Sequence, residues 1–184
     1  QAPLTVNTLD TMIFLQTDQG FEGRTLPVEA QFAPCFDVRV ADWNGDGHED
    51  LFLCQNFFGL DRETGRYDDG RGLLLRGDGT GAFEPISAAR SGIRLWGEQR
   101  GAAVADFDAD GRTDLHVTQN GDRTRLLMNR SAPPGVRVRL RGPIGNLSGL
   151  GATLRMRSRS SHGPVRELHA GAGRGSQDSP VLVF

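Results

Sequence analysis

The 184-residue sequence contains no lysine, only two cysteines and no apolar run of the length that crosses a bilayer. A membrane helix needs about 18 or more consecutive apolar residues, so no membrane span is expected. Cys35 and Cys54 are too few to indicate a disulfide-rich scaffold, and they either pair or remain as buried thiols. All 21 basic residues are arginine, which we interpret as codon bias without functional meaning.

The net charge of −2 conceals an uneven distribution of charge along the chain. Residues 1–122 carry 10 arginines and 21 acidic residues, whereas residues 123–184 carry 11 arginines and two acidic residues. This split predicts two parts with different roles, and we place the boundary near Pro133, which gives regions 1–132 and 133–184. The 25 glycines, nine prolines and 37% apolar content predict an all-β chain of short strands and tight turns.

A repeat with an offset of 64 residues relates residues 38–51 to residues 102–115. Each copy has an apolar, strand-like segment, a nine-residue acidic loop, and an Asp-Leu pair that begins a returning strand. A second element recurs in residues 14–20 and 74–79, each followed by Phe-Glu, and begins again at residues 126–129. One repeat therefore contains about four strands, the content of a propeller blade. We predict partial β-propeller blades over residues 1–132 and a small β-rich domain over residues 133–184.

The two acidic loops carry carboxylate or amide side chains at positions 1, 3, 5 and 9. A glycine at position 6, Gly47 or Gly111, permits a turn that directs the carbonyl of position 7 inward. A set of oxygen ligands suits calcium, whereas zinc and copper favour thiolate or imidazole ligands. The predicted ligands of two calcium ions are Asp42, Asn44, Asp46, Asp50 and the carbonyl of His48 in the first loop, and Asp106, Asp108, Asp110, Asp114 and the carbonyl of Arg112 in the second.

An EF-hand and an acidic turn without metal are the two alternatives to such a calcium loop. An EF-hand requires a glutamate at position 12 and flanking helices, but Leu53 and Val117 occupy that position and the flanks have the pattern of strands. An acidic turn without metal is less favoured because two matched copies occur. The second loop offers four carboxylates and the first offers three, so we expect the second to bind calcium more tightly, provided that flanking charged side chains face solvent.

Both loops, with the preceding apolar strand and the following Asp-Leu, resemble the FG-GAP or VCBS repeat of integrin-type β-propellers over about residues 12–130. The resemblance implies a propeller fold, calcium at the ligands named above, and an extracellular or cell-surface location. Because propellers need about four to eight blades, these two loops are expected to belong to a larger propeller.

The C-terminal region resembles a second family, the ASPIC/UnbV domain, in residues 146–152 and 166–173 and in Ser176-Gln177. That domain follows such propellers in proteins related to cartilage acidic protein. Two departures are present: Arg174-Gly175 replaces an aromatic and an aliphatic residue, and the chain stops at Phe184, where the family pattern continues. The domain is therefore expected to be truncated.

Arginine alternates with apolar residues in residues 136–141 and 154–157, which predicts strands with one arginine face. If the strands are neighbours, this basic patch would bind an acidic glycan or another polyanion. The alternative is a solvated face, or pairing with the acidic first part of the chain. Nucleic acid is not expected, because no aromatic residue is interleaved for base stacking. The arginines of the two faces are Arg137, Arg139, Arg141, Arg155, Arg157 and Arg159.

An enzyme is not expected, because no nucleophile motif or phosphate loop accompanies the four histidines. Glu167 and His169 share one strand face, which we interpret as a surface contact. The leading hypothesis is a calcium-binding extracellular module for adhesion or for binding a protein or glycan, in which calcium is structural. The alternatives are a purely structural scaffold of a larger secreted protein and an accessory domain of an enzyme.

Overall fold

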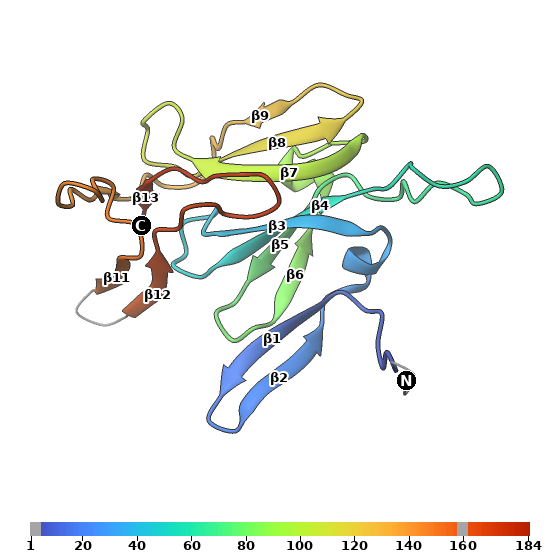
Figure 1. The fold of residues 1–184 in the computed structure, drawn as a ribbon, viewed down its shortest axis with the longest axis horizontal. Helices are drawn as coiled ribbons and strands as arrows, with labels where there is room; N and C mark the ends of the chain where they lie inside the picture. The colour runs from blue at the N-terminus through green and yellow to red at the C-terminus, as the bar shows by residue number, and fades with distance from the viewer. Residues whose placement is uncertain (1–4, 158–161) are drawn as a thin grey trace.

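The computed structural model describes residues 5–157 and 162–184 as a set of small antiparallel sheets (Figure 1). The predicted all-β class is confirmed, and the one α-helix of the described residues is a single turn, α1 (Ala88–Ser91). These residues form no closed propeller ring. No helix in them has the length and apolarity needed to cross a membrane. The first sheet is a hairpin of β1 (Met12–Thr17) and β2 (Gly20–Thr25), and a short 3-10 helix (Val28–Gln31) follows it.

The largest sheet has four antiparallel strands in chain order. They are β3 (Cys35–Ala41), β4 (Asp50–Gln55), β5 (Leu73–Gly77) and β6 (Phe83–Ile86). The two predicted hairpins of one repeat are therefore present, and the turn at residues 78–82 closes with a hydrogen bond from the Asp78 N–H to the Ala82 carbonyl. The segment between β4 and β5 extends from the sheet (Figure 1), and residues 61–69 in it are exposed, as its polar composition predicts.

A second sheet repeats the first three strands of this arrangement. It contains β7 (Glu98–Ala105), β8 (Asp114–Asn120) and β9 (Arg125–Leu127) in that order. Residues 126–127, which were predicted to begin a further copy of the second element, lie in β9, the counterpart of β5. The two sheets are thus built by the same repeat, as the 64-residue offset indicates.

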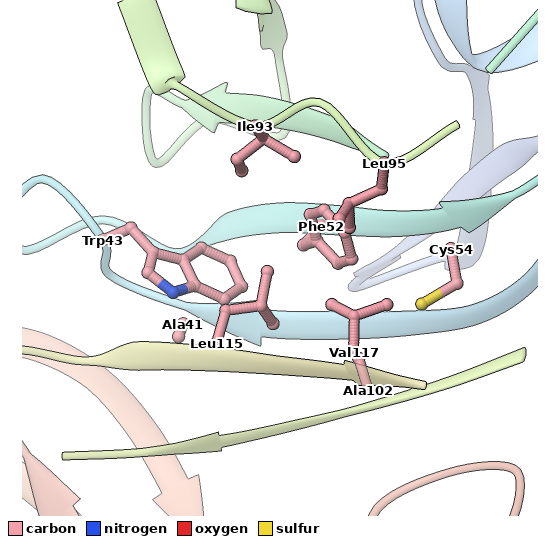
Figure 2. Close-up of a cluster of buried hydrophobic side chains, with 9 residues drawn as sticks. All are labelled: Ala41, Trp43, Phe52, Cys54, Ile93, Leu95, Ala102, Leu115 and Val117. Atoms are coloured by element: carbon pink, nitrogen blue, oxygen red, sulfur yellow. The ribbon is translucent and has the colours of Figure 1, made fainter. Parts of the chain in front are cut away.

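The main hydrophobic core lies between these two sheets (Figure 2). Phe52 and Cys54 from β4 face Ala102 of β7 and Val117 of β8, and Trp43 of the first acidic loop lies at the end of this core. Phe52 and Val117 have no exposed surface, so a truncation such as Phe52→Ala would cost about 3–5 kcal/mol. A smaller cluster around Leu53 and Leu75 packs the β1–β2 region against the other face of the β3–β6 sheet. The main core holds β3 and β7, the first strands of the β3–β6 and β7–β9 sheets, side by side.

The C-terminal region consists of two separate two-stranded sheets. In one, β10 (Arg137–Arg139) pairs with β13 (Val181–Val183), and in the other β11 (Thr153–Arg157) pairs with β12 (His162–Glu167). Among the described residues after 130, only Ala132 and Leu168 are buried apolar side chains. This region has too small a hydrophobic core of its own. It is stabilised by packing on the β3–β6 and β7–β9 sheets.

A buried polar network joins the C-terminal region to β3 and β7. The Arg39 guanidinium, with only 2% of its side chain exposed, lies 2.6 Å from the Asp37 carboxylate and donates to Ser176 Oγ and the Ala172 carbonyl. Asp37 Oδ2 also accepts the N–H of Ala102 at 2.8 Å. On the same strand β7, the Val104 N–H donates to Asp178 Oδ1. These bonds supply acceptors for the N–H groups of β7 and for the Arg39 guanidinium, which would otherwise be buried without partners.

Candidate metal centre

The two acidic loops occupy equivalent positions in neighbouring sheets. Residues 42–50 connect β3 to β4, and residues 106–114 connect β7 to β8. Because β3 packs against β7, both loops leave the sheets at the same end, on the side of the C-terminal strands (Figure 1). The segment after residue 130 lies against both: an added Cβ on Gly45 would be 2.8 Å from Pro133, and the Gly135 N–H donates to the Gly111 carbonyl at 2.7 Å.

The aspartate at position 1 organises each loop by accepting backbone hydrogen bonds. Asp42 accepts the N–H groups of Gly45 and Gly47 at 2.7 and 2.8 Å. In the second loop, Asp106 accepts the N–H groups of Asp110 and Gly111 at 3.0 and 2.9 Å. The glycine at position 6 has a φ of 85° in the first loop and 83° in the second. The predicted turn at this glycine is therefore confirmed, and its left-handed conformation explains the residue type.

The aspartate at position 9 ties each loop to the C-terminal end of the third strand of its sheet or to the residues just after that strand. Asp50 accepts the N–H groups of Trp43 and Gly77, both at 3.0 Å. Asp114 accepts the equivalent N–H groups of Phe107 and Asn129 at 2.9 and 2.7 Å. Both carboxylates are buried, with 2% and 1% of the residue exposed. Position 9 therefore has a structural role, whether or not an ion is bound.

The pKa of the Asp50 carboxyl is raised to about 6, chiefly by burial; the two N–H donors lower this pKa, and the negative charges of Asp42 and Asp46 help to raise it. A divalent cation among these groups would remove the repulsion. The same charges that raise the pKa are thus the ones that would attract a metal ion.

Carboxylate oxygens converge most closely in the second loop. Asp106, Asp108 and Asp114 each offer one oxygen, and these oxygens lie within 4.8 Å of one another. Asp110 is not in this group, because its Oδ1 accepts the Arg112 N–H and its Oδ2 contacts the Arg112 side chain. A cluster of oxygen ligands fits calcium, and these three carboxylates would hold it.

The first loop has a more open arrangement. Asp46 Oδ1 accepts the His48 N–H at 2.9 Å, and the Asn44 amide donates to Asp46 Oδ2 at 2.8 Å. Within the described residues, its carboxylates form no group as close as that of the second loop. The His48 side chain is exposed and lies beside the turn at Gly79. Ligation through the carbonyls of His48 and Arg112 stays a prediction.

Three arginines contact the aspartates of the second loop. Arg112 lies 2.6 Å from Asp110, Arg130 lies 3.0 Å from Asp108, and the Nε of Arg137 lies 2.6 Å from Asp106 Oδ2. The Asp106 side chain has no exposed surface. Arginine countercharges thus replace part of the compensation that a metal ion would supply.

The assumption that charged side chains beside the loops face solvent is wrong. The Arg112 side chain is 23% exposed and also donates to the Ala132 carbonyl at 2.5 Å. Glu49 beside the first loop pairs with Arg166 of β12 at 2.8 Å. Both side chains are drawn inward because the C-terminal region packs over the loops. The expectation that the second loop binds calcium more tightly assumed that these charges are exposed. Ligand count alone therefore does not support it.

The predicted basic patch is divided in the structure. The β10 and β11 strands belong to different sheets, and β10 ends at Arg139, before Arg141. Arg137 pairs with the acidic first part of the chain, in line with the alternative given for these faces, and Arg155 donates to the Gly163 carbonyl. Arg139, Arg141 and Arg157 are exposed, and Arg159 lies outside the described residues.

Sequence reasoning missed the groups that surround the loops. Asn129 holds Asp114 through its N–H and donates its side-chain amide to the Trp43 carbonyl at 2.8 Å, so it joins the two loops. Arg130 and Arg137 are the other missed neighbours. The available signal was the charge asymmetry between residues 1–122 and 123–184, which pointed to pairing but not to particular partners.

The histidine–glutamate pair of the C-terminal region and the two cysteines lie outside the acidic loops. His169 Nδ1 lies 3.5 Å from Glu167 Oε1, with 57% and 44% of the two side chains exposed, which is the surface contact that was predicted. Cys35 and Cys54 are free thiols, and burial raises the pKa of Cys35 to about 11. Compared with known proteins, the chain matches no family model and no curated sequence.

Proposed function

We propose that this chain is a calcium-binding module of β-propeller blades, with one ion in each acidic loop, that acts outside the cell in adhesion or in binding a protein or glycan. One observation carries the proposal: three carboxylates converge in the second loop, and a copy of that loop occupies the same place in the neighbouring sheet. Two acidic loops built on the same hydrogen bonds are difficult to explain as surface turns alone.

The blade assignment is supported by strand order and packing. A four-stranded antiparallel sheet in chain order, packed face to face on a second sheet of the same repeat, is the local arrangement of neighbouring propeller blades. In β3, the first strand of the four-stranded blade, Val38 and Val40 lie on one face, and these residues are 42% and 54% exposed. A further blade packed on that face would bury them.

Calcium is proposed to be structural. Its ligands lie in the turns that join β3 to β4 and β7 to β8. The ion would neutralise the converging carboxylates and thereby hold the loop against the segment after residue 130. For the partner, the exposed Arg139 and Arg141 offer positive charge to an acidic glycan or protein, while Arg137 is already paired.

Thermal unfolding with calcium and with chelator tests the proposal. Extracellular sites of this ligand type bind at about 10⁻⁴–10⁻³ M, and an ion at 100 times its Kd stabilises a folded site by about 2.7 kcal/mol. We expect calcium to raise the Tm and magnesium to raise it much less. The double variant Asp46→Ala, Asp108→Ala should lose this response. Asp68→Ala, an exposed aspartate outside both loops, should keep it.

An unfolding curve that is unchanged between calcium and chelator would overturn the proposal. A rise in Tm that survives in the double variant would place the ion elsewhere in the protein.

A further inference from the structure

The side chain of Arg137 extends from β10 into the second acidic loop. Its Nε lies 2.6 Å from Asp106 Oδ2, and the Asp106 side chain is completely buried while that of Arg137 is 40% exposed. Asp106 is the position-1 carboxylate and one of the three that converge. The arginine therefore supplies positive charge at a carboxylate that a metal ion in this loop would use.

Asp106 has little spare capacity for a second cation. Its Oδ1 accepts the Asp110 N–H, and its Oδ2 accepts the Gly111 N–H in addition to facing Arg137. A guanidinium and a divalent cation repel each other strongly at such short range, above all beside a buried group. An ion that takes an Asp106 oxygen must therefore displace Arg137.

Arg137 is held near the loop by ordered backbone. The Gly135 N–H donates to the Gly111 carbonyl at 2.7 Å, and the Val136 N–H donates to the Phe184 carbonyl at 2.6 Å. β10 then pairs with β13. Because the arginine is tethered a few residues from these bonds, its effective concentration at Asp106 is high and it competes in every molecule.

The first loop provides an internal comparison. Within the described residues, none of its predicted ligands forms an ion pair; Arg166 pairs with Glu49 beside them, which is not a predicted ligand. The two loops thus share a backbone and differ in whether an arginine occupies the position-1 carboxylate.

We propose that Arg137 determines the calcium affinity of the second loop by acting as a built-in competitor of the ion. The inference rests on the proposed function, since it assumes that the loop takes calcium. Binding of calcium releases Arg137 from Asp106 and adds its charge to the exposed Arg139 on the same strand. The second loop consequently binds calcium more weakly than its four carboxylates predict.

Calorimetric titration of calcium tests this proposal in an Asp46→Ala background, which weakens the first loop so that the signal reports the second. Arg137→Gln should tighten calcium binding about tenfold, since it removes one charged competitor. Arg139→Gln is the matched control, two residues along the same strand and without an ion pair in the described residues, and should leave the affinity unchanged. Arg137→Lys keeps the charge and should stay within a few-fold of the parent.

A second readout does not depend on variant stability. In ¹⁵N-labelled protein with the native Arg137, the Nε–H resonance, assigned by its loss in Arg137→Gln, should shift as calcium is added, together with the amide signals of residues 106–114. Equal calcium affinity in the parent and in Arg137→Gln would overturn the role of Arg137, and so would an Nε–H resonance that does not shift when calcium is added. Either result leaves the proposed function standing. Absence of calcium binding in every variant overturns both.

Discussion

Loop 42–50 and loop 106–114 fold around the same hydrogen bonds, but their carboxylates have different surroundings. In both, position 1 accepts amides of the turn, and position 9 accepts the amide of position 2 and one at or just beyond the end of the third strand. In the second loop, three of the four aspartates contact arginines, whereas the described residues place no arginine on the ligands of the first. The local sequence thus sets the backbone, and distant segments set the electrostatics.

The difference teaches that ligand count alone is a poor guide to affinity. An additional carboxylate strengthens the attraction for calcium, but here it comes with countercharges that must be displaced. It also indicates two ways to keep an acidic loop stable without metal. One is compensation by arginine, as in the second loop, and the other is a raised pKa, as at Asp50 of the first.

The largest expected effect concerns what the loops share. Asp114→Ala leaves two backbone N–H groups without acceptors in a buried site, and we expect it to lower the free energy of unfolding by about 3 kcal/mol in chelator. Asp50→Ala should cost a similar amount. Urea unfolding measures both, with Asp108→Ala as the control that keeps these bonds. A loss as small as that of the control would show that position 9 serves only the metal.

A smaller effect distinguishes the first loop by its response to pH. The folded-state pKa of Asp50 is raised from 3.8 to about 6, so the folded protein binds this proton more tightly than the unfolded chain does. Its contribution to stability is full below about pH 4 and is lost as the pH rises through about 6, by about 1–2 kcal/mol after allowance for solvent screening. In calcium-free protein, the difference in unfolding free energy between wild type and Asp50→Asn should follow this curve. A difference that stays constant from pH 4 to 7 would contradict it.

Exchanging the ligands at position 3 sharpens the comparison between the loops. Asn44→Asp gives the first loop a fourth carboxylate and should tighten its calcium binding about three- to tenfold, or about 1 kcal/mol. Asp108→Asn should weaken the second loop less, because Asp108 is already paired with Arg130. Calorimetric titration of each single variant gives the two changes. Equal and opposite changes would mean that the arginines do not screen the second loop.

The smallest expected effect lies at position 4 of the loops. Ala109 has a φ of 63°, whereas its counterpart Gly45 has a φ of 76° in the same left-handed region. A residue with a Cβ is strained there by about 1 kcal/mol, so Ala109→Gly should stabilise the protein by about 0.5–1 kcal/mol. Ala103→Gly in β7 is the control and should destabilise. Thermal unfolding in chelator would decide, and a lower Tm for Ala109→Gly would show that the strain is absorbed elsewhere.

Much of the fold was accessible from the sequence because the relevant signals are local. Alternation predicted β3, and the Asp-Leu pairs predicted the starts of β4 and β8. The positive φ of Gly47 and Gly111 follows from a turn that other residues resist. The repeat also indicated that the two sheets are alike, since equal sequences have equal preferences for strand and turn.

The metal centre was predictable only in part. The spacing of the aspartates predicted the two loops. It did not predict that Asp50 and Asp114 also accept backbone N–H groups at or just after the third strand, because that depends on how the strands pair. Asn129 and Arg137 reach the second loop across 15 and 31 positions of sequence from Asp114 and Asp106. Such contacts arise from the docking of separate segments, and no local pattern encodes them.

By itself, the sequence determined an all-β chain with two acidic loops that share a glycine turn and most side-chain-to-amide bonds, because hairpins, glycine turns and such bonds act over a few residues. The tertiary structure alone decided which charges meet. The arginine-rich C-terminal strands have almost no apolar core, so they dock on the first two sheets and carry Arg137 to Asp106 and Arg166 to Glu49. Electrostatic interactions depend on distance in space and on burial, and these were fixed only when the sheets packed.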